Sequence, residues 1–455
     1  MTHPGTGRQG TLAADEPGAA QSRRTALLAS CIIFLVALNL RPAIVAVGPL
    51  LSSIGATFGW GESLQGLLGA LPLLAFALFS IFVSTLTAKL DTNKVLFWAL
   101  IVLAGGCIAR SFLGEGFVWV GTLLIGASIA VGNVLAPAIV KRDFIDRVSF
   151  ATGAYSACVT TGSAIAGLTA AAAADALGGW QPALALWALP ALIAAMLWAL
   201  RSRYGSVGLP KARHTAKTET AIEPIGKAEA KPRMITSDQA KRAKSAANPP
   251  AQPEAAGNET KPQPKPTSAT RTLLHRRTTW LVTLFMGLQS AAFYTFCNWL
   301  PSIAAAAGFT SAEAGVHLFI FQALGIFSGL AIPRFMYVRN NQVCAALIAS
   351  VPLLVASLGW LFAPQFSLAW SIFGGVGQGA SLVVALTLIS LRGKGHAETV
   401  ALSGIAQSLG YLLAACGPFA FGALTEATGA FAAPLAFMAA LAAAQCLLSV
   451  PAGKR

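Results

Sequence analysis

Twelve apolar runs, each about as long as a helix that crosses a bilayer, constrain this chain more than any other feature. A transmembrane helix needs about 20 predominantly apolar residues. The runs lie near residues 26–52, 63–86, 95–113, 117–140, 150–174 and 181–200, and then near residues 279–303, 312–333, 342–362, 366–390, 399–423 and 430–450. Lipid cannot form hydrogen bonds with unpaired backbone N–H and C=O groups. The pattern therefore predicts an all-α membrane protein with twelve transmembrane helices in two six-helix bundles.

The net charge of +15 points at first toward nucleic acid, but its distribution argues against such a partner. Residues 201–277 hold 16 basic and 6 acidic residues, which is about two-thirds of the surplus. This stretch does not interleave aromatic residues with its charges. The chain as a whole is 11% charged, against about 25% in soluble domains. We therefore expect a membrane protein that binds no nucleic acid.

The same basic stretch divides the chain. Its composition is rich in Pro, Ala, Lys, Glu and Thr, with KPQPKP at 261–266, and cannot bury enough apolar surface to fold. We expect five regions, which are a cytoplasmic tail (1–24), a first bundle (25–203), a disordered basic cytoplasmic linker (204–275), a second bundle (276–450) and a cytoplasmic C-terminal tail (451–455). The linker is expected to be attracted to the anionic inner leaflet.

Lys and Arg residues alternate between the two sides of the predicted bundles. They occur in the N-terminal tail, after runs 2, 4, 8 and 10, and at the C-terminus, whereas the connections after runs 1, 5, 7, 9 and 11 have none. The second side has only Arg110, at the end of run 3. By the positive-inside rule, both termini are cytoplasmic and the protein spans a bacterial-type inner membrane.

A weak internal repeat relates the two halves. Gly59 and Gly66 are each followed 249 residues later by a glycine, at Gly308 and Gly315. A polar helical face in the fifth run also recurs in the eleventh, at an offset of 247. Duplicated six-helix units are typical of secondary transporters, whose solute site lies near the midplane between the halves.

Arg41 lies near the middle of the first run, where a charge costs at least ~2.5–3.5 kcal/mol on insertion scales. No Asp or Glu lies in the interior of any run, so the simplest partner for Arg41 is an anionic solute. The alternative is that Arg41 bonds only to freed backbone carbonyls and water.

Two prolines support a site at this depth. Pro42 and Pro49 leave the carbonyls of Leu38 and Val45 without helical donors. Because residues 38 and 45 are seven apart, we expect a kinked helix with both carbonyls on one side, lining a cavity. In the fourth run, Pro137 likewise frees the carbonyl of Asn133.

Polar residues inside the runs complete the candidate substrate-binding set. Its members are Arg41, Asn39, Asn133, Tyr155, Gln289, Tyr294, His317, Gln378, Gln407 and Tyr411. Asn39 faces another side of a regular helix than Arg41, and Asn133 is equally compatible with a solute contact and with helix packing. Each candidate of the second half, taken alone, favours helix packing. His317 is the only histidine inside a run and leaves proton coupling open, although the lack of carboxylates there argues against it.

Signals for catalysis and cofactors are absent. The seven cysteines lie inside apolar runs without CxxC or Cys/His metal spacing, and no phosphate loop or nucleophile–base pair is present. We expect no enzyme activity, no metal and no cofactor. The expected partners are a small anionic solute and the lipid bilayer, and the chain is expected to be a monomer.

Three segments resemble one known family. They are NLRPAIVAVGPLL (39–51), GNVLAPAIVKRDF (132–144) and ALSGIAQSLGYLLAACGP (401–418), and they are similar to the cyanate/2-nitroimidazole (CynX/NimT) transporter family of the major facilitator superfamily. The resemblance implies a two-bundle fold that works by alternating access and carries small anions or polar heterocycles. The resemblance also implies that Arg41 and Asn133 are functional positions.

The resemblance also points to a gating loop with departures from the superfamily pattern. The segment TAKLDTNKV (87–95) keeps only Asp91 and Lys94 of the usual motif, and Arg142 and Asp143 follow the fourth run. The sequence thus predicts a secondary active or facilitative transporter with Arg41 facing the solute. A drug-type efflux transporter is the alternative within transport, and a solute sensor that signals through the linker is the alternative from another class.

Overall fold

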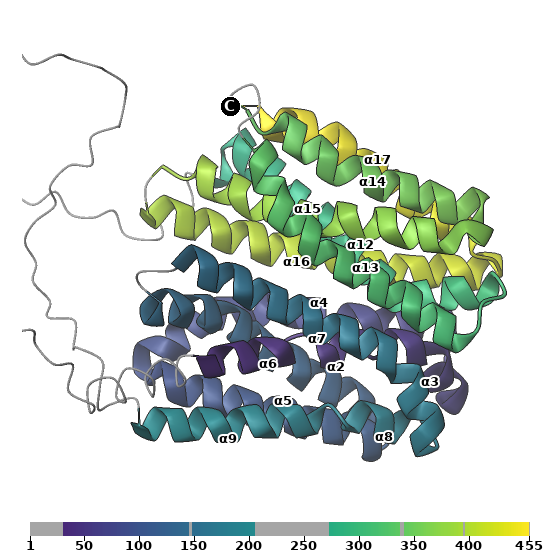
Figure 1. Cartoon of the computed structure of the whole chain (residues 1–455), viewed down its shortest axis with the longest axis horizontal. Helices are drawn as coiled ribbons and strands as arrows, with labels where there is room; N and C mark the ends of the chain where they lie inside the picture. Colours follow the sequence, from purple (N-terminus) through teal and green to yellow (C-terminus); the bar gives the residue numbers. More distant parts are fainter. Residues whose placement is uncertain (1–30, 145–147, 205–272, 337–340, 395, 455) are drawn as a thin grey trace, which may run out of the picture. The chain divides into compact units, whose positions relative to one another are not determined.

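The computed structural model describes residues 31–144, 148–204, 273–336, 341–394 and 396–454. Within them, twelve helical segments are long and apolar enough to cross a membrane, and no strand is present. The prediction of an all-α protein with twelve spans is therefore confirmed (Figure 1). The predicted tail and linker lie almost wholly outside the described residues, so the disorder and the signalling role considered for the linker stay predictions.

The first bundle begins with a helical segment at residues 31–39. Its other elements are α2 (Pro42–Val45), η1 (Gly48–Leu50), α3 (Leu51–Phe58), α4 (Glu62–Lys89), α5 (Thr92–Phe112), α6 (Glu115–Asp143), α7 (Val148–Leu177), α8 (Trp180–Ala185) and α9 (Ala188–Tyr204). The first span is thus divided among several short elements, and the sixth between α8 and α9.

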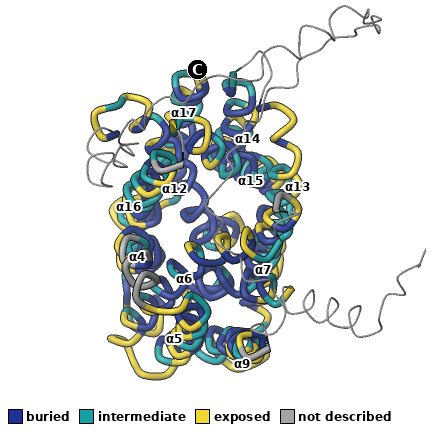
Figure 2. Tube along the Cα trace, turned by 90° about the vertical axis from the view of Figure 1, so that its left-hand side faces the viewer, coloured by how far each residue is buried: buried dark blue, intermediate teal, exposed yellow. Residues whose placement is uncertain are grey.

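The second bundle has longer uninterrupted helices. Its elements are α12 (Arg277–Ala306), α13 (Ser311–Ala331), η3 (Ile332–Phe335), α14 (Val343–Phe362), η5 (Pro364–Phe366), α15 (Ser367–Arg392), α16 (His396–Thr428) and α17 (Ala432–Gly453). Apolar side chains pointing away from the bundles, such as Trp98 and Leu447, are more than half exposed, as suits lipid contact. Figure 2 shows buried residues where helices face one another and exposed residues on the outward faces.

The first span is interrupted and not merely kinked, which corrects the expectation from the sequence. Arg41 lies between the helical residues 31–39 and α2, and its φ of −131° and ψ of −24° are not helical. A turn and η1 follow α2 before the regular α3 begins. Pro42 and Pro49 each remove a backbone donor, so the short segment between them cannot form a continuous ladder. The carbonyls of residues 38 and 45 therefore do not share one side of a regular helix.

The glycines of the predicted repeat have matching structural roles. Gly59 and Gly308 each follow a helix with positive φ, of 69° and 91°, which lets the chain reverse direction before α4 and α13. Gly66 on α4 packs against α16, and Gly315 on α13 packs against α7. The α4–α16 and α7–α13 pairs are the most extensive helix contacts between the bundles. The repeat therefore corresponds to two equivalent contacts, one on each side.

The bundles approach each other closely at the end away from the basic connections, which we call the opposite end. A Cβ at Gly66 would lie 2.5 Å from the carbonyl oxygen of Pro418, and one at Gly315 would lie 3.2 Å from that of Leu168. Gly48 similarly abuts the carbonyl of Cys297.

Two further contacts join α4 to α16 at this end. Gly422 abuts the carbonyl of Glu62, and the backbone N–H of Ser63 donates to Glu426. We call the set of contacts made by Gly48, Gly66, Gly315, Gly422 and Glu426 the interbundle seal.

Candidate functional site

A cavity of about 670 Å³ lies between the two bundles. Its wall is formed by α7 of the first bundle and by α12, α13, α15 and α16 of the second, together with Arg41 at the break in the first span. From Arg41 the lining continues to Thr152, Pro333 and Ser390, which lie near the basic end of their helices. The cavity therefore extends toward the basic end, while the interbundle seal lies at the opposite end.

Arg41 is the single charged residue among the described residues that line the cavity. Its guanidinium carbon lies 4.9 Å from the ring centroid of Phe293, which belongs to α12 of the second bundle. None of the three ion pairs formed by the described residues includes Arg41, and its guanidinium has no hydrogen-bond partner among them. The guanidinium is held against an aromatic face, and its N–H donors are free. It is therefore suited to bind an anionic or strongly polar group.

Aromatic residues from both bundles surround this charge. Tyr155, Tyr294 and Tyr411 lie near the Arg41 guanidinium, and the last two line the cavity. Phe76 on α4 packs edge-on against Tyr294 and Tyr411, with ring centroids 6.3 and 5.3 Å apart. The predicted tyrosines are therefore gathered around Arg41, although Tyr155 is not among the residues that line the cavity.

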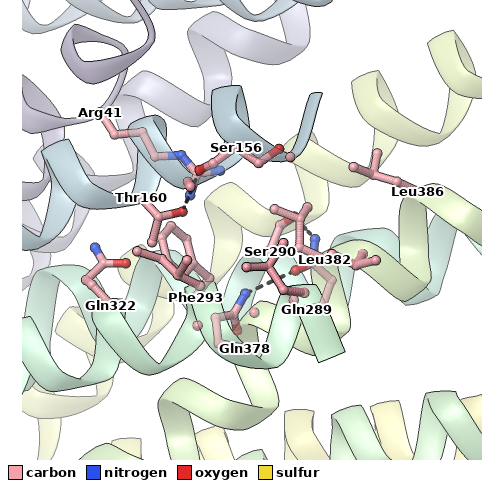
Figure 3. A pocket seen from close by; sticks show the side chains of 18 of the residues that line it. Arg41, Ser156, Thr160, Gln289, Ser290, Phe293, Gln322, Gln378, Leu382 and Leu386 are labelled. Carbon is pink, nitrogen blue, oxygen red and sulfur yellow. Dashed lines mark hydrogen bonds between the residues drawn. The ribbon is translucent and has the colours of Figure 1, made fainter. Parts of the chain in front are cut away.

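Two glutamines supply neutral polar groups in the same cavity. Gln289 donates from Nε2 to the hydroxyl of Ser290 at 2.7 Å, and Gln378 donates from Nε2 to Oε1 of Gln289 at 3.1 Å. Oε1 of Gln378 is buried and has no hydrogen-bond partner among the described residues. This oxygen is therefore an unsatisfied acceptor buried in the wall of the cavity. Figure 3 shows both side chains in the cavity wall.

Sequence reasoning missed several residues that line the cavity beside Arg41. Ser156 and Thr160 come from α7 and lie next to Arg41 in Figure 3. They belong to the polar helical face that supported the repeat, and that face was the available signal. Phe293 and Gln322 also line the cavity. Nothing in the sequence distinguishes Phe293 from the other phenylalanines of the apolar runs.

Besides Tyr155 and His317, three predicted candidates do not line the cavity. Asn39 is buried and donates from Nδ2 to the carbonyl of Leu35 at 2.8 Å, within its own helix. Asn133 is partly buried on α6, outside the lining. Gln407 donates from Nε2 to the hydroxyl of Ser403 at 2.8 Å, one helical turn away.

His317 lies in a different place, at the opposite end of the second bundle. It lines a second cavity of about 460 Å³, together with Phe309 and Glu313. Its Nε2 is 2.9 Å from the hydroxyl of Ser367. His317 is therefore separate from the group that surrounds Arg41. Within the part of the chain that the structure describes, no three His, Cys, Asp or Glu side chains gather as metal ligands.

The predicted gating residues lie at the basic end of the first bundle. Asp91 caps α5 by accepting from the backbone N–H groups of residues 93 and 94, and the side chain of Lys94 is exposed. Arg142 donates from Nε to Oδ1 of Asp143 at 2.8 Å, and the other carboxylate oxygen of Asp143 pairs with Arg201. All of these contacts are within the first bundle, and a gating role stays a prediction.

Comparison with known proteins agrees with this architecture. The chain is 32% identical to the 2-nitroimidazole transporter of Escherichia coli (strain K12) over 427 residues, which cover 93% of this chain and 94% of that protein. It is 22% identical to the cyanate transport protein CynX of the same organism, over 90% of this chain and 92% of that protein. The crystal structure of the nucleoside transporter NupG (D323A mutant) is similar in fold, with a TM-score of 0.69, 11% identity and coverage of 94% and 99%.

The two relatives in Escherichia coli bear the names of transporters and not of enzymes, in agreement with the expectation from the sequence. A family model described as Major Facilitator Superfamily matches residues 26–415, a range that takes in most of both bundles. The resemblance drawn from three short segments is thus supported along most of the chain. This multi-pass membrane protein belongs to the Major Facilitator Superfamily.

Proposed function

We propose that the protein is a secondary active or facilitative transporter that moves a small anionic or polar solute across a bacterial inner membrane by alternating access. The observation that carries the proposal is Arg41, an unpaired cation in a cavity between two bundles. A lone charge at this depth is costly, and a solute that supplies the opposite charge offsets that cost. The break at Arg41 supports the same role, because irregular backbone within a membrane is tolerated where it lines a cavity.

The groups around the cavity favour a planar solute with polar edges. The guanidinium of Arg41 is suited to an anionic or nitro group, and the amides of Gln289 and Gln378 in the cavity wall are suited to polar edges. The aromatic rings offer flat faces against which a heterocycle packs. The 2-nitroimidazole transporter and the cyanate transport protein among the relatives support this choice of solute class.

The contacts between the bundles support an assignment of the transport state. With the basic connections placed in the cytoplasm, the cavity extends toward the cytoplasm and the interbundle seal faces outward. The structure then corresponds to an inward-facing state. Access from outside requires the α4–α16 and α7–α13 contacts to separate and the basic end to close.

The test is uptake of labelled cyanate and of labelled 2-nitroimidazole into proteoliposomes containing the purified full chain. Hydrogen bonds to charged groups contribute about 1.5–3 kcal/mol, so Arg41→Gln is expected to weaken saturable uptake by about 10- to 100-fold. Arg41→Lys keeps the charge without the planar guanidinium, and its saturable uptake is expected to lie between those of the wild type and Arg41→Gln. Arg334→Gln changes an exposed arginine outside the cavity and serves as the matched control.

A correctly inserted Arg41→Gln variant that transports either solute normally would contradict the role of Arg41. Loss of uptake in the Arg334→Gln control as well would show a general effect of removing a basic residue. The amount of each variant in the membrane is measured alongside, so that loss of protein is separated from loss of transport.

Export of a larger, weakly polar compound is a second candidate function, favoured by the apolar part of the wall. Ile326, Leu382, Val383 and Leu386 line the cavity between Arg41 and the basic end. The volume of about 670 Å³ also exceeds what a small anion fills. A strain lacking the protein would then become more susceptible to such compounds, and the Arg41→Gln variant would restore resistance as well as the wild-type protein does.

A further inference from the structure

A second arginine, Arg110, is buried inside the first bundle. Its side chain is 1% exposed, although the sequence places it at the end of a predicted span, beside a connection. It belongs to the last turn of α5, where α5 packs tightly on α6. A Cβ added at Gly121 would come within 2.7 Å of the Cβ of Arg110, so the arginine has no path between these two helices. Its side chain extends toward the interrupted first span instead.

Arg110 contacts the backbone of that span. Its Nη1 donates a 2.7 Å hydrogen bond to the carbonyl oxygen of Ala43, the second residue after Arg41. Its Nε and Nη2 are buried without a hydrogen-bond partner among the described residues. None of the three ion pairs in those residues involves Arg110. The guanidinium is therefore held in the bundle by a peptide carbonyl and not by a carboxylate.

The carbonyl of Ala43 needs this donor because the helix is interrupted. In a continuous α-helix the N–H of Val47 would donate to it, four residues back. Here the N–H of Val47 donates to the carbonyl of Ile44 at 3.2 Å, because the chain tightens into a turn after α2. An unpaired carbonyl in an apolar bundle is costly, so the broken geometry requires a donor from elsewhere.

We propose that Arg110 is a positioning residue for Arg41, which it holds in the cavity by supplying the donor that stabilises the interrupted form of the first span. The proposal rests on the proposed function of Arg41. Without Arg110, the N–H of Val47 regains the Ala43 carbonyl and α2 lengthens beyond Val45, while the two prolines keep the span interrupted. This change of winding between Pro42 and Pro49 moves Arg41, which lies at the start of α2, from its place over Phe293.

The first readout does not depend on the solute. Ser156 lines the cavity beside Arg41, and a cysteine placed there in a full-length chain without its seven native cysteines reports the local charge. The rate of modification by anionic methanethiosulfonate ethylsulfonate is divided by the rate with the cationic ethyltrimethylammonium reagent. Arg41→Gln calibrates the ratio and is expected to lower it by several-fold, because the nearby positive charge is lost.

Arg110→Met is expected to lower the ratio to the level of Arg41→Gln, and Arg110→Lys, which keeps a donor, is expected to restore part of it. In the Arg41→Gln background, Arg110→Met is expected to change nothing further, because its effect acts through Arg41. Ser111→Ala, which removes a buried hydroxyl next to Arg110 without touching Ala43, is the matched control and is expected to leave the ratio unchanged.

The second readout is equilibrium binding of 2-nitroimidazole and of cyanate to the purified full chain. Arg110→Met is expected to weaken binding of the transported probe by about tenfold, with partial recovery in Arg110→Lys. A wild-type reagent ratio in a folded Arg110→Met protein would overturn the proposal, and so would an additional drop in the ratio in the Arg41→Gln background. If Arg41→Gln itself binds both probes normally, the proposed function fails, while the reagent ratio still decides the role of Arg110.

Discussion

The backbone N–H of Ser63 donates a 2.7 Å hydrogen bond to Oε2 of Glu426, and the two residues belong to different bundles. Ser63 lies in the first turn of α4, whose unpaired N–H groups favour a negative charge. Glu426 lies near the end of α16 and so caps a helix of the other bundle. This contact closes the seal at the opposite end, and its strength helps to set how readily that end opens.

Removal of this cap is expected to favour opening. Loss of a helix cap costs about 1 kcal/mol, so Glu426→Ala is expected to raise the population open at that end by about fivefold. Cys297, buried against Gly48 in the seal, is a native reporter once the other six cysteines are replaced. Its labelling by an impermeant thiol reagent added from outside should increase by the same factor, whereas equal labelling in both proteins would show that the cap does not restrain opening.

A methyl group at Gly66 is expected to have a larger effect on the seal. Its Cβ would lie 2.5 Å from the carbonyl oxygen of Pro418 and 3.1 Å from the Cα of Phe419, and backbone atoms cannot move aside separately. Gly66→Ala should therefore disfavour the sealed state, increase labelling of Cys297 and slow transport. Gly105→Ala is the control, because a Cβ at Gly105 meets no atom within 4 Å. Equal transport by the two variants would contradict the close-approach argument.

Gln378 is expected to affect solute affinity and not the amount of protein in the membrane. Gln378→Met removes the unpaired Oε1 and the hydrogen bond to Gln289 while keeping a side chain of similar size. Loss of one hydrogen bond of about 1 kcal/mol should raise the KM of uptake by about fivefold with little change in the maximal rate. Gln407→Met, outside the cavity lining, is the control and should leave the KM unchanged.

Phe293 is expected to act through its aromatic face. A cation over a ring is stabilised by about 0.5–2 kcal/mol, so Phe293→Leu should weaken solute binding by about two- to thirtyfold by loosening the position of Arg41. Phe293→Tyr keeps the face and is expected to retain most of the affinity. Equilibrium binding of the transported probe measures both variants. If Leu and Tyr behave alike at this position, the contact between ring and guanidinium does not position Arg41.

Most of the architecture could be predicted from the sequence because it depends on properties of single segments. Apolar length alone determines that a run crosses the bilayer, and it led to the twelve spans. The glycine repeat was also recognisable, because positive φ at Gly59 and close packing at Gly66 both require the absence of a side chain. Arg41 was recognisable as a candidate because no Asp or Glu lies inside the apolar runs to neutralise its charge.

The remaining features depend on contacts between distant segments and could not be predicted in the same way. Whether the first span is kinked or interrupted depends also on a donor for the carbonyl of Ala43, which Arg110 provides from another helix. His317 was grouped with the cavity residues by residue type, but its position along α13 places it in a different cavity. Phe293 became a candidate only when the structure placed it beneath Arg41.

If the protein works by the proposed alternating access, an unpaired guanidinium between a closed and an open end also makes the empty protein sensitive to membrane voltage. The electric field falls mainly across the closed end, so a change of access moves the field past Arg41, which is worth up to about 2.3 kcal/mol per 100 mV for one charge. With the basic end in the cytoplasm, as proposed, an interior-negative potential would retain the empty protein with its cavity toward the cytoplasm. An anionic solute would cancel the charge and with it the voltage dependence, so that the return of the empty protein, and not the loaded step, would respond to the potential.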